Sequence, residues 1–273
     1  MRGDKAQASA FLKKASDSAP DDPSYAFYYA FSFDQTDLAA WQRLSLALID
    51  RFPQHNRAAQ ALYWLGVRAP AEADQARYLE RLKRDFPPER FSWSADGMDA
   101  LFEVYAKSNP DKALALAREM VVSGPARDLD RWKAIASLEA TLVGARDLMA
   151  AGKAGDALAL LEAVTPPKSL RLIPLHLAKA AAEQAMGQPQ KAYDRLADLV
   201  ATEPVHDLHA ALFEQAKLMN KSAAQVSGDL RARREKQAKP AHEFELENYL
   251  DGSRASLAKF RGKVVLLNFW YPG

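Results

Sequence analysis

The sequence contains no cysteine among its 273 residues. This absence excludes disulfide bonds, thiolate zinc sites and thiol nucleophiles for the chain as given. No apolar run approaches about 18 residues, so we expect no membrane-spanning helix. The net charge is only +2, which does not indicate a nucleic-acid partner. The opening segment, MRGDKAQASAFLKKAS, lacks the apolar core of a signal peptide, so we expect either a cytoplasmic protein or an export segment outside this chain.

Proline divides the Ala- and Leu-rich residues 1–235 into segments of similar length. Because proline cannot continue the hydrogen-bond ladder of a helix, each proline is expected to close a helical segment. The spacings are 33, 34 and 38 residues, and then 79 residues across two units. The prolines concerned are Pro20, Pro53, Pro87, Pro125 and Pro204. A period of this size indicates stacked helical hairpins.

The residues before these prolines also repeat. Small or apolar residues stand 12, 8 and 5 positions before the proline, and this spacing keeps them on one helix face. Four segments have these positions: Ala8, Leu12, Ala15; Ala113, Ala117, Met120; Ala192, Leu196, Leu199; and Gln75, Leu79, Leu82, in which only the first residue is polar. Gly152 and Gly187 are expected to mark the bend between the two helices of a pair. The unit before Pro53 fits poorly, with Trp41 and Ser45 in these places.

This pattern resembles the tetratricopeptide repeat, and the segment ALYWLG (61–66) resembles the first helix of such a repeat. The resemblance implies a mainly α protein with five or six helix pairs over residues 5–236. Since a pair cannot bury its own apolar face, the pairs are expected to stack into a curved α-solenoid with a concave face. We predict that residues 1–238 form this helical-repeat domain, and that protein partners or substrate proteins bind its concave face.

The segment SYAFYYAFSF (24–33) holds six aromatic residues, more than one helix face needs. Some of them could line a peptide groove, and we name Tyr25, Tyr28, Tyr29 and, from the next pair, Trp64 as candidates. The alternative is that the rings fill the core of the first repeat pair, as aromatic stripes usually do. The sequence alone favours this second interpretation.

Two further segments offer weaker signals. HDLH (206–209) places two histidines on one helix face, but no third metal ligand stands nearby. GARDLMAAGKAG (144–155) lacks the glycine-to-lysine spacing of a phosphate-binding loop, and an alanine follows its lysine. We therefore predict no metal site and no cofactor.

The composition changes at Pro240. Phe244 and Leu246 alternate with polar residues, and a turn signal follows at Asp251–Gly252. The run Val264–Leu267 is apolar throughout, as in a strand buried on both faces of a sheet. A single strand is not stable in water. We therefore expect residues 239–273 to be the opening of an incomplete α/β domain, with Val264–Phe269 as its best-formed strand.

The sequence of this segment resembles the start of the thioredoxin-like domain in TlpA- and ResA-type thiol–disulfide oxidoreductases. The family pattern runs from Phe-x-Leu through an Asp-Gly turn and Ser-Leu to Arg-Gly-Lys-Val-Val-Leu-Leu-Asn-Phe-Trp. The matching residues are Phe244, Leu246, Asp251, Gly252, Ser256, Leu257 and the run Arg261–Trp270. The resemblance implies a thioredoxin-like fold, redox chemistry on partner proteins, and a periplasmic or cell-envelope location.

In that family three residues follow the tryptophan, and the Cys-x-x-Cys motif comes directly after them. The resemblance implies that the residues before it position the redox cysteines, which are expected beyond Gly273. These residues are Asn268, Phe269, Trp270, Tyr271, Pro272 and Gly273. The family usually has tryptophan where Gly273 stands. We expect the chain as given to be inactive in thiol chemistry, because it has no cysteine.

Two alternatives stay open at this point. Tyr271–Pro272 also fits a peroxiredoxin of the alkyl-hydroperoxide-reductase group, in which a single peroxidatic cysteine follows a short loop. The other alternative is a non-catalytic scaffold that binds proteins through its helical repeats.

Overall fold

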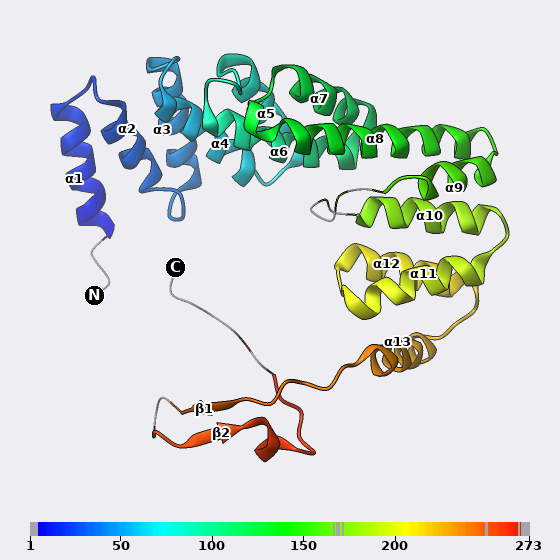
Figure 1. Cartoon of the computed structure of the whole chain (residues 1–273). Coiled ribbons are helices and arrows are strands. Elements are labelled where there is room, and N and C mark those ends of the chain that lie inside the picture. The colour runs from blue at the N-terminus through cyan, green and yellow to red at the C-terminus, as the bar shows by residue number, and fades with distance from the viewer. Residues whose placement is uncertain are drawn as a thin grey trace. The chain divides into compact units, whose positions relative to one another are not determined.

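The computed structural model describes residues 5–165, 167, 170, 172–248, 251–266 and 268. Within these residues it contains thirteen α-helices, two short 3-10 helices and two short strands (Figure 1). The prediction of a mainly α protein built from helix pairs is therefore confirmed. The helices are α1 Lys5–Ser18, α2 Pro23–Phe31, α3 Leu38–Arg51, α4 Asn56–Arg68, α5 Glu72–Asp85, α6 Ser92–Ser108, α7 Pro110–Ser123, η1 Ala126–Asp128, α8 Leu129–Ala150, α9 Ala154–Glu162, α10 Ile173–Ala185, α11 Pro189–Thr202, α12 His206–Leu218 and α13 Ala223–Gln237.

The helix ends follow from local side-chain chemistry. Asp22 accepts a hydrogen bond from the amide of Ser24 and thereby caps α2, whose first residue is Pro23. Asp37 caps α3 in the same way. Ser222 and Gln225 form a reciprocal capping box at the start of α13. The prolines found by their spacing all lie in the connections that precede α2, α4, α6, α8 and α12.

One turn recurs between the helices of a pair. Gly152 ends α8 at φ 72°, Gly187 ends α10 at φ 72°, and Asn220 ends α12 at φ 55°. In each case the next residue donates its amide to a carbonyl five residues earlier, as Lys153 does to Leu148. This is the Schellman arrangement, which needs a residue in the left-handed region. The sequence signal at Gly152 and Gly187 is confirmed, and Asn220 is the third instance.

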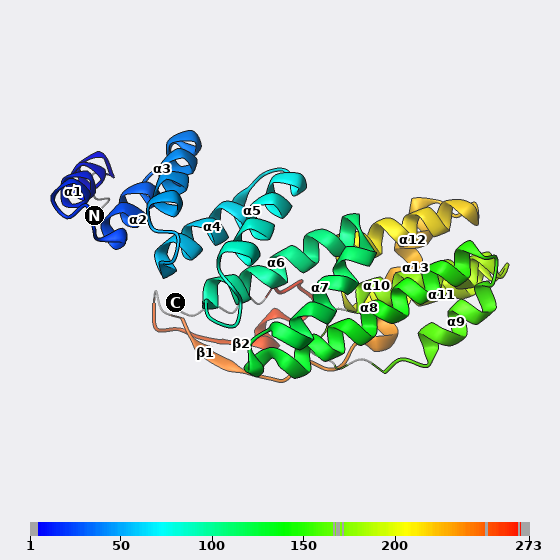
Figure 2. The ribbon, with the colours of Figure 1, turned by 90° about the horizontal axis from the view of Figure 1, so that it is seen from above.

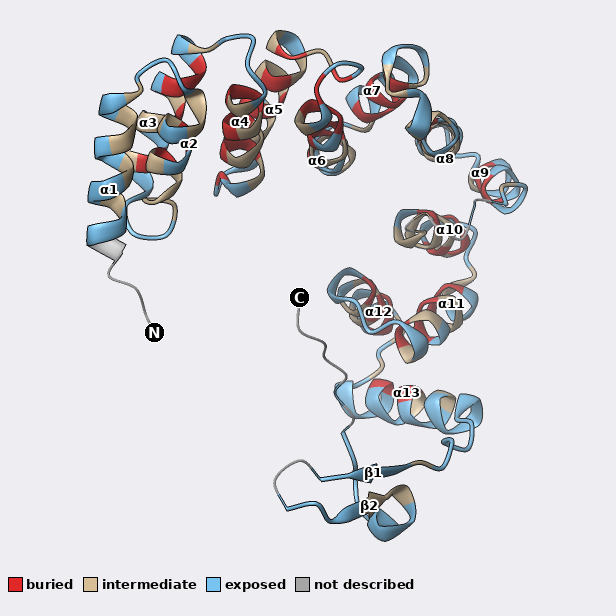
Figure 3. Cartoon of the chain, turned by 60° about the vertical axis from the view of Figure 1, so that its left-hand side comes forward, coloured by how far each residue is buried: buried red, intermediate tan, exposed pale blue. Residues whose placement is uncertain are grey.

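The chain divides into two compact units, residues 1–196 and 197–273, with the division inside α11. In unit 1, α1 packs on α2, and each later helix contacts the next one along the chain as far as α10. The even-numbered helices also contact each other across successive pairs, α2 with α4, α4 with α6 and α8 with α10. Figure 2 shows these helices stepping along unit 1. In Figure 3, α6 and α10 lie on the inner side of the unit 1 arc, while α7 and α9 lie on its outer side.

The core of unit 1 lies between the helices of successive pairs, where the buried residues in Figure 3 concentrate. Ala113, Ala117 and Met120 are buried on α7, as their spacing predicted. Gly66 on α4 lets Leu79 of α5 approach closely, because a Cβ at residue 66 would stand 2.6 Å from that side chain. Burial of this kind between neighbours is what stabilises a helical-repeat stack.

Side-chain bonds join equivalent places in neighbouring pairs. Arg131 on α8 bonds Asp99 on α6, 32 residues earlier. Arg81 on α5 bonds Asp50 on α3, 31 residues earlier. Lys83 on α5 bonds Glu119 on α7, 36 residues later. These separations reproduce the period of the prolines, so the repeat visible in the sequence is also the repeat of the contacts.

Unit 2 holds the end of α11, then α12, α13 and an antiparallel hairpin of β1 Glu245–Glu247 and β2 Arg254–Ser256, followed by η2 Leu257–Phe260. Leu246 pairs with Ala255 in the register of the hairpin. Gly252 at φ 68° makes the predicted turn, and the carboxylate of Asp251 accepts a hydrogen bond from the amide of Ser253 at 2.9 Å. A predicted domain boundary at residues 238/239 is not tested by the division inside α11 and stays a prediction.

The prediction that Val264–Phe269 is the best-formed strand is wrong for its described part. Val264, Val265, Leu266 and Asn268 form no strand, while Leu267 and Phe269 lie outside the described residues. The reason is that β1 and β2 pair only with each other in the described part of the chain. A strand without a partner has no ladder to join. Val264 and Leu266 are accordingly almost fully exposed.

Candidate functional site

The predicted groove residues lie on the even-numbered helices of unit 1. Tyr25, Tyr28 and Tyr29 are on α2, and Trp64 is on α4. Tyr28 is 46% exposed and Tyr25 is 40% exposed, whereas Tyr29 and Trp64 are half-buried. The structure therefore combines both interpretations of the aromatic segment, because Phe27 is buried in the core while its neighbour Tyr28 is not.

A continuous row of rings connects α2, α4 and α6. The Phe31 and Trp64 ring centroids are 6.1 Å apart, and Trp64 lies 6.2 Å from Trp93 of α6. Tyr63 contacts both tryptophans, at 5.1 Å from Trp64 and 5.3 Å from Trp93. We call Phe31, Tyr63, Trp64 and Trp93 the aromatic row. All four are only partly buried, so the row contributes to the core and to the surface formed by the even-numbered helices.

Two arginines on α4 contact the rings of this surface, Arg68 within the row and Arg57 at Tyr28 beside it. The Arg68 guanidinium lies 4.7 Å from the Trp64 centroid and 5.1 Å from the Phe31 centroid, and it also forms an ion pair with Asp34. The Arg57 guanidinium lies 4.9 Å from the Tyr28 centroid and donates a hydrogen bond to the Tyr28 hydroxyl at 3.0 Å. Cation–π contacts of this kind fix ring orientation. The rings are thus positioned before any partner binds.

Of the aromatic row, the sequence candidates included only Trp64. Phe31 lies in the aromatic segment but was not chosen, and Tyr63 and Trp93 were missed. Tyr63 was visible in ALYWLG, the segment already interpreted as a first helix, one position before the chosen Trp64. Trp93 stands at the start of the next first helix, α6. Following the aromatic residues from one first helix to the next would have found both residues.

Carboxylates follow the aromatic row on α6. Asp96, Asp99 and Glu103 are spaced three and four residues apart and so share one helix face. Burial raises the pKa of the Tyr63 phenol, and the nearby charges of Asp96 and Asp99 raise it further. The tyrosine is therefore neutral at physiological pH and sits beside negative charge.

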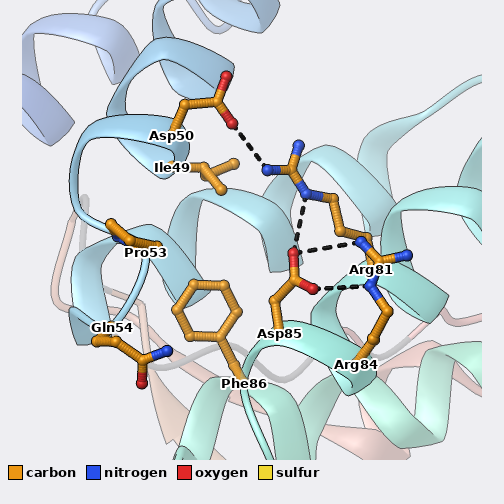
Figure 4. Close-up of a pocket in the computed structure, with 8 residues that line it drawn as sticks. All are labelled: Ile49, Asp50, Pro53, Gln54, Arg81, Arg84, Asp85 and Phe86. Atoms are coloured by element: carbon orange, nitrogen blue, oxygen red, sulfur yellow. Dashed lines mark hydrogen bonds and ion pairs between the residues drawn. The ribbon is translucent and has the colours of Figure 1, made fainter.

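A separate pocket lies between α3 and α5, with a volume of about 460 Å³ (Figure 4). The close-up shows Arg81 and Arg84 pointing toward Asp85, and Arg81 reaching Asp50. Burial opposes ionisation of Asp85, but the hydrogen bonds from Arg84 and Arg81 outweigh it and hold its pKa below the ordinary value. Because the charges of this pocket already neutralise one another, it offers a weaker ligand site than the aromatic row.

The remaining sequence candidates are the two histidines of HDLH and the residues expected to position redox cysteines. His209 stacks on Phe213 with centroids 6.5 Å apart, and His206 is exposed at the start of α12. Within the described residues, no three His, Cys, Asp or Glu side chains gather as they would around a metal ion.

Of the residues expected to position a redox site, Asn268 is exposed and outside regular structure, and residues 269–273 lie outside the described part. No helix in that part is long and apolar enough to cross a membrane.

Comparisons with known proteins give few matches. No protein-family model matches the chain, and no curated protein matches it. Among solved structures, the chain is similar to PilW, described as a widely conserved type IV pilus biogenesis factor, with a TM-score of 0.41 and 20% sequence identity. That alignment covers 77% of this chain and 91% of the PilW chain.

Proposed function

We propose that this chain is a protein-binding scaffold of tetratricopeptide-like helix pairs, and that a partner segment binds along α2, α4 and α6. The observation that carries the proposal is the aromatic row, which joins these three helices and stays partly exposed along its length. Helical-repeat stacks present extended surfaces of this kind. Aromatic side chains dominate binding where they are fixed and partly exposed, since they bury much area at little entropic cost.

The arginines favour this surface further. Arg57 and Arg68 hold the rings in one arrangement, so a partner would not need to order them. Tyr25 and Tyr28 extend the surface beyond the row and are the most exposed aromatic residues of α2. An extended peptide lying across α2, α4 and α6 would contact each of these rings in turn.

Nitrogen-15 indole NMR signals offer a direct test with a pooled library of extended twelve-residue peptides. We expect the signals of the half-buried Trp64 and Trp93 to shift on titration, while those of the buried Trp41 and Trp132 stay in place. The variant Tyr25→Ser/Tyr28→Ser should weaken binding. The matched control Phe11→Ser, another exposed aromatic residue on α1, should not. Equal shifts in all four tryptophans, or none, would contradict the proposal.

A second candidate function concerns the tail. We propose that residues 239–273 open a thioredoxin-like domain and that the whole protein is a periplasmic thiol–disulfide oxidoreductase, with a peroxiredoxin as the alternative. The supporting observation is the β1–β2 hairpin, whose Asp251–Gly252 turn lies where the resemblance requires one. Sequencing the ten codons after residue 273 tests this proposal. A Cys-x-x-Cys motif would support the thiol–disulfide oxidoreductase, and a single cysteine would support the peroxiredoxin. The absence of cysteine would leave only the protein-binding scaffold. Residues 1–273 alone should reduce insulin disulfides no faster than buffer.

A further inference from the structure

The face of α6 next to the aromatic row carries two carboxylates that no described residue neutralises. Asp99 is paired with Arg131 through two hydrogen bonds, at 2.6 and 3.1 Å. Asp96 and Glu103, on either side of Asp99, are exposed and form no ion pair or hydrogen bond with any described residue. Two carboxylates on one exposed helix face are therefore free to bind an incoming cation.

The two α4 arginines that contact the rings of this surface already have partners, and Arg131 of α8 is held by Asp99. Arg57 is engaged by Tyr28 and by Gln60, and Arg68 by Asp34 and the rings around it. The one other charged residue in line with them on α6 is Lys107, which follows Glu103 by one turn. Asp34 neutralises the charge of Arg68, whereas the hydrogen-bond partners of Arg57 are neutral side chains. Asp96 and Glu103 therefore leave negative charge on the α6 face that carries Trp93.

Rings and carboxylates lie close enough to act on one side chain. The Tyr63 and Trp93 centroids are 5.3 Å apart, and Asp96 follows Trp93 by three residues, so it lies on the same side of α6. Burial, and after it the charge of Asp96, raise the pKa of the Tyr63 phenol, in agreement with this placement. A long side chain with an apolar stem and a cationic end suits such a surface, because the stem covers the rings and the head reaches the carboxylates.

We infer that this part of the surface binds a lysine or arginine of the partner segment, with the cationic head between Asp96 and Glu103 and the stem against Tyr63 and Trp93. The inference rests on the proposed scaffold function and adds the chemistry of the partner, a basic extended peptide. Charge complementarity is the reason for choosing a basic occupant over an acidic or neutral one.

The test uses three pools of extended twelve-residue peptides that differ only at one central position, which is lysine, glutamine or glutamate. The flanking positions are randomised among apolar and neutral polar residues. We expect the lysine pool to bind about tenfold more tightly than the glutamine pool, as one or two exposed ion pairs and a cation–π contact allow. The glutamate pool should bind more weakly than both. The lysine preference should shrink at high salt, because exposed charges are screened.

The variant Asp96→Asn/Glu103→Gln keeps the shape of both side chains and removes their charge. It should bind the lysine and glutamine pools equally while keeping the affinity for the glutamine pool. The control Asp156→Asn/Glu203→Gln makes the same change in charge at exposed positions outside α6 and should keep the lysine preference. Circular dichroism of both variants checks that the helices are retained.

The outcomes separate the two levels of the proposal. If the three pools bind the native chain equally and shift Trp64 and Trp93, the basic partner is overturned and the scaffold function stands. A lysine preference that survives in the Asp96→Asn/Glu103→Gln variant overturns the assignment to this surface. If no pool binds and no tryptophan signal moves, the scaffold function and the basic partner both fail.

Discussion

The Arg195 guanidinium donates two hydrogen bonds to the carboxylate of Glu183, from Nε at 2.9 Å and from Nη2 at 2.6 Å. Glu183 on α10 is fully buried, and Arg195 reaches it from α11. Lys191 lies 3.3 Å from the same carboxylate. Burial opposes ionisation of Glu183, but Arg195 and Lys191 outweigh it and hold its pKa below the ordinary value. The pair therefore joins the two helices through a charged contact inside the core.

Removing one partner of this pair should be costly. Arg195→Ala leaves a buried carboxylate with only Lys191, and we expect a loss of about 3 kcal/mol in the free energy of unfolding. Urea unfolding followed by circular dichroism measures it. The double variant Glu183→Leu/Arg195→Leu should recover most of the loss, because no buried charge remains. A double variant no more stable than Arg195→Ala would contradict this account.

Glu139 should make the folded protein less stable as the pH rises. It is 6% exposed on α8, it forms no hydrogen bond or ion pair with described residues, and burial raises its pKa to about 7 from the ordinary 4.5. Because the folded state holds the proton more tightly than the unfolded state, the stability cost is absent below pH 4.5, grows between pH 4.5 and 7, and is complete above pH 7.

Glu139→Gln should remove this cost. We expect the variant to gain up to roughly 2 kcal/mol at pH 8, a value reduced for partial solvation of the carboxyl, and to change little at pH 4. Thermal unfolding at the two pH values measures the difference. A gain of the same size at both would show that packing and not ionisation distinguishes the two side chains.

Gly187 and Gly228 should respond oppositely to alanine. A Cβ would meet no atom within 4 Å at either position, but Gly187 has φ 72° and Gly228 lies inside α13. Gly187→Ala should cost about 1 kcal/mol through left-handed strain, whereas Gly228→Ala should gain about 0.5–1 kcal/mol through helix propensity. Chemical unfolding of both variants provides the comparison. Two effects of the same sign would contradict the role assigned to the turn.

Deleting residues 240–273 should leave the helical signal and the thermal midpoint almost unchanged. No described residue in this range is buried, and Leu246, Val264 and Leu266 are exposed apolar side chains. Their removal should improve solubility, since exposed apolar segments without strand partners promote aggregation. Circular dichroism and light scattering on the two chains test both expectations. A large fall in the midpoint would show that the tail is an integral part of the helical fold.

The helix pairs were predictable because their signals are local. A proline that follows a helix and the small residues on α7 and α11 are signals within one helix or turn, and the structure buries those small residues as expected. Of the aromatic row only Trp64 was named from the sequence. Tyr63 and Trp93 are visible as aromatic residues of first helices, but their contact with each other depends on how α4 meets α6. The strand at Val264 failed for a similar reason. Its apolar run is a local signal, but a strand forms only when another segment pairs with it.

The side-chain bonds between neighbouring pairs, such as Arg131 with Asp99 and Lys83 with Glu119, span about one repeat length. A helix pair emerging from the ribosome therefore finds its partners in the pair made just before it and in the pair that comes next. At about 5–20 residues per second, roughly 35 further residues arrive within about 2–7 s. Apolar faces on a growing chain would thus stay uncovered only for seconds, and loop closure costs little because the contacts are near in sequence. Synthesis and folding can proceed in step from the first pair onward.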